Sequence, residues 1–204
     1  MSTKNHAKYE RTLVIIKPDG IQRSLIGEVI RRYERAGLKL VGIKMVVPTQ
    51  EMVEAHYTLD PEWKRKTGEK NLQAYKDKGL KPPHEDPIKQ SDMILMKLKK
   101  YFASGPIIAM VWQGAHAVSI VRKITGGTEP LNSDVGTIRG DYVIDSYNLA
   151  DDDMRAVRNI VHASGNVTEA NMEIDYWFKK EELVDYRLLV DAMLYDQSIE
   201  GILE

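Results

Sequence analysis

Short apolar runs alternate with amphipathic segments along this chain, and their order limits the folds that it can adopt. Runs rich in Val, Ile and Leu predict buried strands at residues 12–16, 38–47, 107–112 and 160–162. Apolar residues at helical spacing predict helices between and after these strands, at residues 26–37, 49–56, 91–101, 117–124 and 167–177. Such an order suits either a doubly wound parallel sheet or a ferredoxin-like antiparallel sheet, and the pattern alone does not choose between them.

The connecting segments carry weaker signals. Residues 141–144 predict a further short strand, and the acidic run Asp151 to Asp153 predicts the start of a short helix, because acidic side chains stabilise a helix N-terminus. Ser91 is the expected N-cap of the helix at 91–101. Residues 61–90 are rich in proline and lysine and poor in apolar residues, which predicts an insertion.

Composition excludes several classes of protein. The 204 residues suffice for one domain with a sizeable core and are too few for two of ordinary size. The chain has no cysteine, so thiolate nucleophiles and cysteine-based metal sites are excluded. No apolar run approaches the roughly 20 residues of a membrane span, and residues 1–10 do not resemble a signal peptide. We therefore expect a cytoplasmic protein without a membrane partner.

Charge is balanced overall and polarised locally. The formal net charge is -1, so a nucleic acid is not the expected partner. Residues 62–100 nevertheless carry eleven basic and six acidic side chains, whereas residues 141–204 carry five basic and fifteen acidic ones. A solvated surface is the simplest explanation of each block. Nucleic-acid binding through residues 62–100 is the alternative, and it would show a steep salt dependence.

His162 is the histidine best placed for chemistry. It closes an apolar strand, and the small residues at 163–165 leave room for a substrate. Glu173 lies on the edge of the helix face that should pack on the sheet, where a carboxylate is costly without a partner. A carboxylate bound to one imidazole nitrogen fixes the tautomer and leaves the other nitrogen free as a nucleophile. A structural His162 and a solvent-directed Glu173 are the alternatives.

Three cationic residues are candidates for phosphate binding. Lys17, Arg122 and Arg139 each lie where a strand or helix runs into a loop. Phosphoryl transfer requires fixed positive charge around the migrating group, and arginine offers a planar fork of donors to phosphate oxygens. The chain contains neither G-x-x-x-x-G-K-[ST] nor G-x-G-x-x-G, so phosphate chemistry here would proceed without a Walker loop. Taken singly, each cation is more often a surface charge than a ligand.

Five segments of the chain, in order, resemble the signature segments of nucleoside diphosphate kinases. They are Lys17–Gly20, Ser104–Pro106, Gly136–Asp141, Asn159–Ser164 and Glu181–Tyr186. The resemblance implies an α+β, ferredoxin-like core with a four-stranded antiparallel sheet (βαββαβ) flanked by helices. It also implies a single domain of residues 1–204, with insertions at about 61–90 and 145–158 and a C-terminal extension at 187–204.

The same resemblance implies a reaction and its residues. His162 would take the γ-phosphoryl group from a nucleoside triphosphate such as ATP and pass it to a nucleoside diphosphate in a ping-pong exchange. The implied catalytic residues are His162, Glu173, Lys17, Tyr57 and Ser164. The implied nucleotide contacts are Lys17, Arg122, Thr128, Arg139, Asn159, Ile94 and Leu98. Magnesium should arrive with the nucleotide, bridged mainly by its phosphates rather than by protein ligands, and the protein should be a homo-oligomer, either a hexamer or a tetramer.

The chain departs from the family pattern in three places. Gly165 stands where the family usually has an aspartate, so a carboxylate near the magnesium is missing. Ile94 stands where the family has a base-stacking aromatic, and either an aromatic of the first insertion, such as Trp63, or an aliphatic surface would then hold the base. Residues 142–158 are lengthened. These departures motivate an alternative, a non-catalytic nucleotide-binding scaffold on the same fold, although such a module would not need His162 as a nucleophile.

Overall fold

The computed structural model describes residues 7–196, and their centre is a four-stranded antiparallel sheet in the order β2-β3-β1-β4. The strands are β1 Glu10–Ile16, β2 Lys39–Val46, β3 Ile107–Gly114 and β4 Val161–Ala163. This arrangement confirms the expected α+β, ferredoxin-like sheet. The antiparallel pairing excludes the doubly wound parallel alternative.

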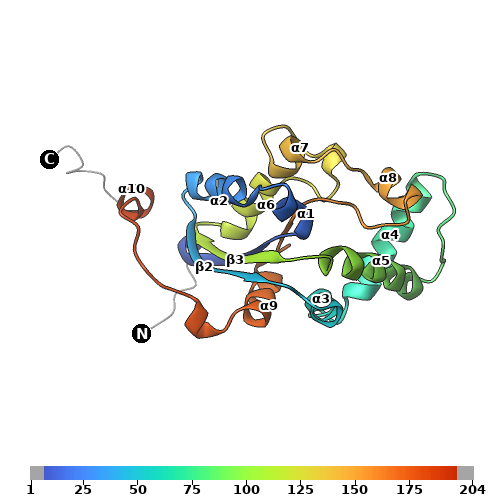
Figure 1. Ribbon diagram of the computed structural model, residues 1–204, viewed down its shortest axis with the longest axis horizontal. Helices are drawn as coiled ribbons and strands as arrows, with labels where there is room; N and C mark the ends of the chain where they lie inside the picture. The colour runs from blue at the N-terminus through green and yellow to red at the C-terminus, as the bar shows by residue number, and fades with distance from the viewer. Residues whose placement is uncertain (1–6, 197–204) are drawn as a thin grey trace.

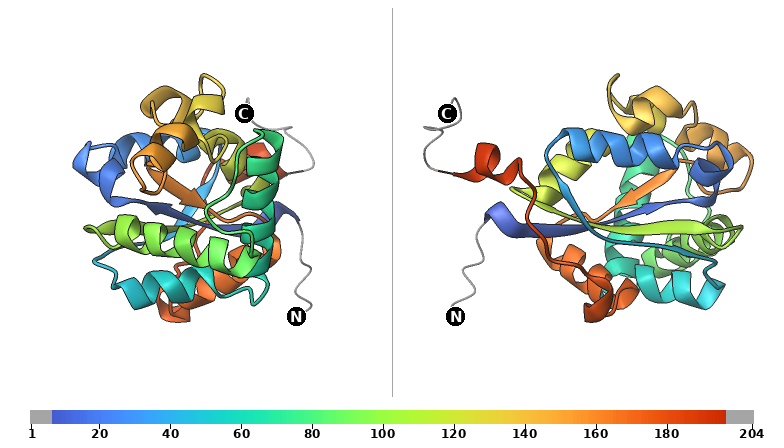
Figure 2. Two further views of the ribbon diagram at one scale, coloured as in Figure 1. Left: turned by 90° about the vertical axis from the view of Figure 1, so that its right-hand side faces the viewer. Right: turned by 60° about the vertical axis from the view of Figure 1, so that its left-hand side comes forward.

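Helices cover both faces of this sheet (Figure 1). The α-helices are α1 Pro18–Gln22, α2 Ile26–Arg35, α3 Gln50–Tyr57, α4 Trp63–Asp77, α5 Pro87–Phe102, α6 Ala117–Thr125, α7 Ile138–Tyr142, α8 Tyr147–Asp152, α9 Val167–Trp177 and α10 Asp191–Tyr195. The short 3-10 helices are η1 Ala7–Tyr9, η2 Pro130–Asn132 and η3 Lys180–Glu182. One layer contains α2 and α6, and the opposite layer contains α3 and α9, as Figure 2 shows from two further directions. None of the helices in the described part of the chain is long and apolar enough to cross a membrane.

The alternation of side chains along β1 produces two separate cores. Val14 and Ile16 belong to a cluster with residues of α2 and α6, whereas Leu13 and Ile15 belong to a cluster with residues of α3, α5 and α9. All four side chains are fully buried. Because β1 is covered on both faces, the loop that follows it and the neighbouring strand β4 are rigidly placed.

Three local predictions were wrong. Residues 141–144 form no strand; residues Ile138–Tyr142 are the helix α7, which begins where the Thr137 hydroxyl accepts the N–H of Gly140. The helix α5 begins at Pro87 rather than at Ser91, because the Asp86 side chain caps it. The acidic run from Asp151 lies at the end of α8 and not at its start, since the Ser146 side chain caps that helix.

The expected insertion at 61–90 contains an ordered helix. The fifteen residues of α4 pack on α5, and Gly68 makes the close approach possible, because a Cβ added there would lie 1.9 Å from the carbonyl oxygen of Pro87. At its far end α4 meets α8 of the second insertion (Figure 1). Lys78 Nζ donates to Asn148 Oδ1 at 2.9 Å, and the Tyr75 hydroxyl lies 3.5 Å from Asp151 Oδ2. The two insertions therefore contact each other at one end of the molecule.

Candidate active site

His162 lies on β4, paired with Ile15 of β1. Its Nε2 is 2.8 Å from Oε1 of Glu173, which projects from α9 and is 3% exposed. Nδ1 makes no hydrogen bond within residues 7–196. The strand is entered through Ile160, whose φ of 50° is unusual for a β-branched residue. The structure thus brings the candidate nucleophile and its expected carboxylate into contact and leaves the other ring nitrogen free.

The Glu173 carboxylate has a second buried partner. The hydroxyl of Ser164, two residues after His162, donates to Oε2 at 2.5 Å. Burial raises the pKa of Glu173, while burial and the positive charge of Lys17 lower the pKa of His162. The imidazole is therefore neutral at pH 7, which is the protonation state that a nucleophilic nitrogen requires.

Lys17 is buried beside the nucleophile strand. Its amine donates to Oδ1 of Asn159 at 2.7 Å and lies 5.1 Å from the centre of the Tyr101 ring. Burial, and next the charge of Arg139, lower the pKa of Lys17 to about 7. Asn159 in turn donates from Nδ2 to the carbonyl oxygen of Thr128 at 3.0 Å. Three of the residues assigned by resemblance to phosphate and ribose contacts therefore form one connected group.

Arg139 is placed differently from the expectation of a free phosphate ligand. It is 7% exposed, and its guanidinium donates to four backbone carbonyl oxygens. The acceptors are Gly126, Gly127, Asn159 and Val161. Because a guanidinium has five N–H donors, at most one remains for a ligand. Arg139 holds the loop after α6 against the nucleophile strand and contributes positive charge behind it.

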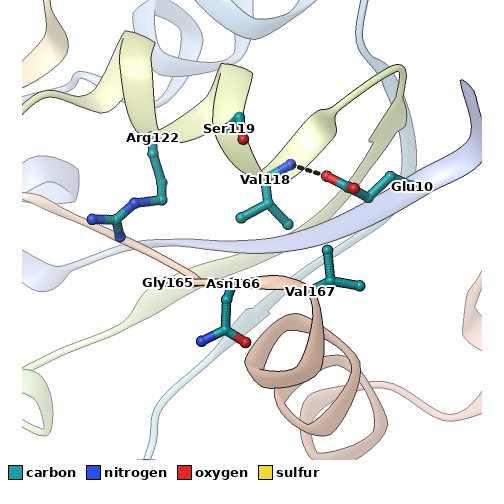
Figure 3. Close-up of a pocket in the computed structure, with 7 residues that line it drawn as sticks. All are labelled: Glu10, Val118, Ser119, Arg122, Gly165, Asn166 and Val167. Carbon is teal, nitrogen blue, oxygen red and sulfur yellow. Dashed lines mark hydrogen bonds between the residues drawn. The ribbon is translucent and has the colours of Figure 1, made fainter. Parts of the chain in front are cut away.

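Arg122 is the exposed cation of the set. It projects from α6 and borders a cavity of about 470 Å³ that is also lined by Glu10, Val118, Gly165 and Asn166 (Figure 3). The carboxylate of Glu10 accepts the N–H of Val118 at 2.8 Å, so this acid is already paired.

A second cavity, of about 460 Å³, adjoins the nucleophile. Its lining includes His162, Tyr57, Trp63 and Glu169, and Asn166 borders both cavities. The Trp63 ring lies against that of Tyr57, with 5.3 Å between the ring centres. The first insertion therefore supplies an aromatic side chain to the wall of the site. By contrast, neither Ile94 nor Leu98, both half-buried on α5, lines either cavity.

A neighbouring acidic side chain occupies the space that a carboxylate at position 165 would take. A Cβ added to Gly165 would lie 2.6 Å from Oε2 of Glu169, so the side chain of Glu169 occupies the space beside Gly165. Burial and the nearby charge of Glu173 raise the pKa of Glu169. The site therefore has an acidic group at this point, supplied from the first turn of α9.

One cluster has the spacing of metal ligands. His56, His162 and Glu173 each offer one ligand atom, and these atoms lie within 4.8 Å of one another. The set is rich in nitrogen and already hydrogen-bonded between His162 and Glu173, whereas Mg²⁺ is bound by oxygen ligands. The cluster does not fit a magnesium ion.

Several residues of the site were missed from the sequence. Besides Glu169, they are His56, Trp177 and Tyr101. His56 and Trp177 share a hydrogen bond beside Glu173. The Tyr101 hydroxyl donates to Asp19 Oδ1 at 2.7 Å and accepts the N–H of Asn159. His56 could have been noticed because it lies three residues after Val53, on the buried face of its helix. No sequence signal connects Tyr101 with Asn159, because their contact depends on how α5 packs.

An imidazole held by a buried carboxylate, with cations around it and on this fold, defines a phosphotransferase of the histidine type. A family model described as nucleoside diphosphate kinase matches residues 10–76 and 87–183. The chain belongs to the nucleoside diphosphate kinase family, as the resemblance predicted, and is accordingly a nucleotide-handling kinase.

Individual relatives agree with this assignment. The chain is 47% identical over 180 residues to a nucleoside diphosphate kinase of Pyrobaculum aerophilum, covering 86% of this chain and 98% of that protein. The crystal structure of an NDP kinase from the same organism superposes with a TM-score of 0.82 at 44% identity, covering 87% of this chain and all of the other (100%). A structure of the Borrelia burgdorferi nucleoside-diphosphate kinase, a transition state mimic with bound vanadate and ADP, has a TM-score of 0.75 at 32% identity and covers 91% of this chain and 96% of that one.

Proposed function

We propose that His162 is the phosphoryl carrier of this nucleoside diphosphate kinase. Nδ1 attacks the γ-phosphorus of a nucleoside triphosphate, the N–P bond forms as the bond to the β–γ bridging oxygen breaks, and the nucleoside diphosphate leaves with that oxygen. A second diphosphate then takes the phosphoryl group by the reverse steps. The observation that carries the proposal is the contact of 2.8 Å between His162 Nε2 and Glu173 Oε1, which leaves Nδ1 as the only free ring nitrogen.

The buried groups around His162 have separate tasks. Glu173 keeps the Nε2 proton in place while Nδ1 gains and loses phosphorus, and Ser164 holds the other oxygen of that carboxylate. Lys17 is the charge with the largest effect on the pKa of His162, which it lowers, and Arg139 orders the loop that carries Thr128. Since the two nucleotides have similar phosphoryl potential, alignment and neutralisation of charge account for most of the catalysis.

The resemblance assigns the nucleotide contacts to both exposed and buried residues. Arg122 and Thr128 are exposed, Asn159 is buried and donates to the carbonyl oxygen of Thr128, and all three would bind phosphate and ribose. The Trp63 ring packs against that of Tyr57. Trp63 is a better stacking partner for the base than Ile94 or Leu98, because the latter two do not line the cavities. The nucleotide affinities of Trp63→Ala and Ile94→Ala test which of these two residues stacks on the base.

Magnesium would enter this site bound to the nucleotide. Glu169, which fills the space beside Gly165, is the oxygen ligand closest to the usual acidic position, and the hard carboxylate fits Mg²⁺ directly or through water. When bound, the ion would neutralise charge on the phosphates. The remaining neutralisation falls to Lys17, Arg122 and Arg139.

Assembly is a further part of the proposal. The edge strand β2 exposes Ile43 and Met45, Val47 directly after it is also exposed, and such apolar side chains on an edge strand support association into a homo-oligomer, a hexamer or a tetramer. A single domain, with the two insertions and the C-terminal extension of which residues 197–204 lie outside the described part, also stays a prediction. The same holds for a cytoplasmic location and for the absence of nucleic-acid binding.

The test is transfer of label from γ-labelled ATP and Mg²⁺. We expect acid-labile, base-stable label on the wild-type protein, release of the label by added diphosphates, and no label on His162→Ala. Correctly folded wild-type protein that binds ADP and never becomes labelled would instead support the scaffold alternative.

A further inference from the structure

His56 is enclosed directly behind the reacting pair. It lies near the end of α3, its side chain is 0% exposed, and its ring centre is 4.7 Å from that of His162. Its Nδ1 is 3.2 Å from the indole Nε1 of Trp177. An indole N–H is a donor only, so Nδ1 of His56 is the acceptor. In the neutral ring the proton therefore sits on Nε2.

The Nε2–H of His56 faces the Glu173 carboxylate. The Nε2 nitrogen is 3.6 Å from Oε1, the same oxygen that binds His162. This N–H has no hydrogen-bond partner among the described residues. A buried donor without a partner is destabilising, so such a group calls for an explanation. A small shift of Glu173 brings Oε1 within hydrogen-bond distance of both imidazoles.

We infer that His56 is a positioning residue for the phosphoryl transfer, acting through Glu173. Phosphorylation of His162 on Nδ1 makes the Nε2–H of His162 more acidic. In that state the Nε2–H of His56 donates to Oε1 of Glu173. With Ser164 on Oε2, the carboxylate then has three donors and stays ionised, which keeps the Nε2 proton on His162. Trp177 determines which nitrogen of His56 faces Glu173. The inference rests on the proposed function of His162.

Electrostatics around His56 agree with a neutral donor. Burial, and next the charge of His162, lower the pKa of His56 to about 3, so the ring does not compete for a proton. The groups that face it are His162 of β4, Glu173 and Trp177 of α9, Lys17 before α1 and Tyr57 of its own helix. Among them, Glu173 presents a carboxylate oxygen to Nε2 at 3.6 Å. A neutral Nε2–H that points at the carboxylate favours the ionised form of Glu173.

Two matched substitutions separate the two nitrogens of His56. His56→Asn keeps an acceptor for Trp177 and removes the donor to Glu173, whereas His56→Gln places an amide N–H close to the former Nε2. We expect His56→Asn to slow single-turnover phosphorylation by MgATP about ten-fold, the kinetic equivalent of one hydrogen bond to a charged group, with KM within about two-fold. His56→Gln should recover to within about three-fold of wild type. Equal rates in wild type and His56→Asn would overturn the inference.

A double-mutant cycle tests whether the effect passes through Glu173. In a Glu173→Gln background, His56→Asn should cause no further loss, and in the wild-type background it should move the acidic limb of the pH–rate profile to higher pH, because the pKa of Glu173 rises. An equal loss in both backgrounds would assign His56 to packing alone. If the wild-type protein is not phosphorylated, the proposed function fails before the role of His56 is tested.

The unmodified protein provides a measurement that does not depend on variants folding. Imidazole ¹⁵N shifts of the full chain should show His56 with Nδ1 unprotonated and Nε2 protonated from about pH 5.5 to 8. Phosphorylation of His162 should move the His56 Nε2–H signal downfield. The opposite tautomer, or an Nε2–H signal that ignores phosphorylation, would contradict the inference.

Discussion

The wall behind His162 and the rim made by the two insertions are stabilised in opposite ways. Glu173, Lys17 and Arg139 are buried charged groups whose polar atoms are bound by neighbours. The rim is held by pairs in which both partners are exposed, such as Arg65 with Glu69 in α4. Removing one partner of a buried charged group costs several kcal/mol, whereas an exposed ion pair contributes about 0–1 kcal/mol. The wall therefore tolerates little change, and the rim can vary.

The largest effect is expected at Arg139. Arg139→Ala leaves four carbonyl oxygens without their donor, so the free energy of unfolding should fall by about 3–5 kcal/mol, and nucleotide binding and transfer should weaken with it. Urea denaturation followed by circular dichroism measures the loss. Arg122→Ala, which removes an exposed guanidinium, is the matched control and should leave stability nearly unchanged. Equal stability of the two variants would contradict the contrast between buried and exposed charged groups.

The next effect concerns the reacting pair. Glu173→Ala should slow phosphorylation by about 100-fold, because Nε2 loses the acceptor that orients the ring, while ADP affinity stays within about three-fold. Stopped-flow phosphorylation and equilibrium titration with ADP separate the two quantities. A large loss of ADP affinity with normal phosphorylation would show that Glu173 contacts the nucleotide instead.

A smaller effect is expected at Gly165, just after the nucleophile strand. Gly165→Asp brings a second carboxylate against Oε2 of Glu169, only 2.6 Å from the new Cβ, so transfer should slow by about ten-fold. The double variant Gly165→Asp, Glu169→Ser keeps one carboxylate and should recover most of the rate. Initial rates over a range of Mg²⁺ concentrations measure both. If the double variant is slower than the single one, Glu169 does not replace the missing acid.

The pH dependence of nucleotide binding tests Lys17. Since its pKa is lowered to about 7, the amine loses its proton as the pH rises through that value. ADP affinity should therefore be highest below pH 7 and fall by about five-fold by pH 8. Isothermal titration at several pH values measures this. Lys17→Arg keeps its charge throughout and should show a nearly flat profile above pH 7; a parallel decline in both proteins would assign the titration to another group.

The smallest effect belongs to the contact between the insertions. Asp151→Ala removes the acceptor facing Tyr75 and Lys97, both at 3.5 Å, so thermal stability should change by less than about 1 kcal/mol and transfer rates should not change. Differential scanning calorimetry with a parallel transfer assay is sufficient. A loss of more than about 3 kcal/mol would show that the contact between the insertions is as sensitive as the buried charged groups behind His162.

Local patterns were enough to predict most of the scaffold. The β-branched runs before Lys17 and His162 became β1 and β4, and Gly37, with a φ of 85°, follows α2 as the terminator that its position suggested. The failures came where two signals competed. The capping hydroxyl of Thr137 starts a helix that includes residues 141 and 142, and Asp86 with Pro87 starts α5 before Ser91.

The sequence by itself determined the family, the candidate nucleophile and its acidic partner, because strand and helix periodicities act over a few neighbouring residues and signature segments can be read in order. Only the tertiary structure decided what those residues touch. The carbonyl oxygens that bind Arg139 lie 12 to 22 residues away along the chain, and Glu173 lies more than a hundred residues from His56, so both contacts depend on distances between separate segments. Packing sets such distances, and no local pattern encodes them.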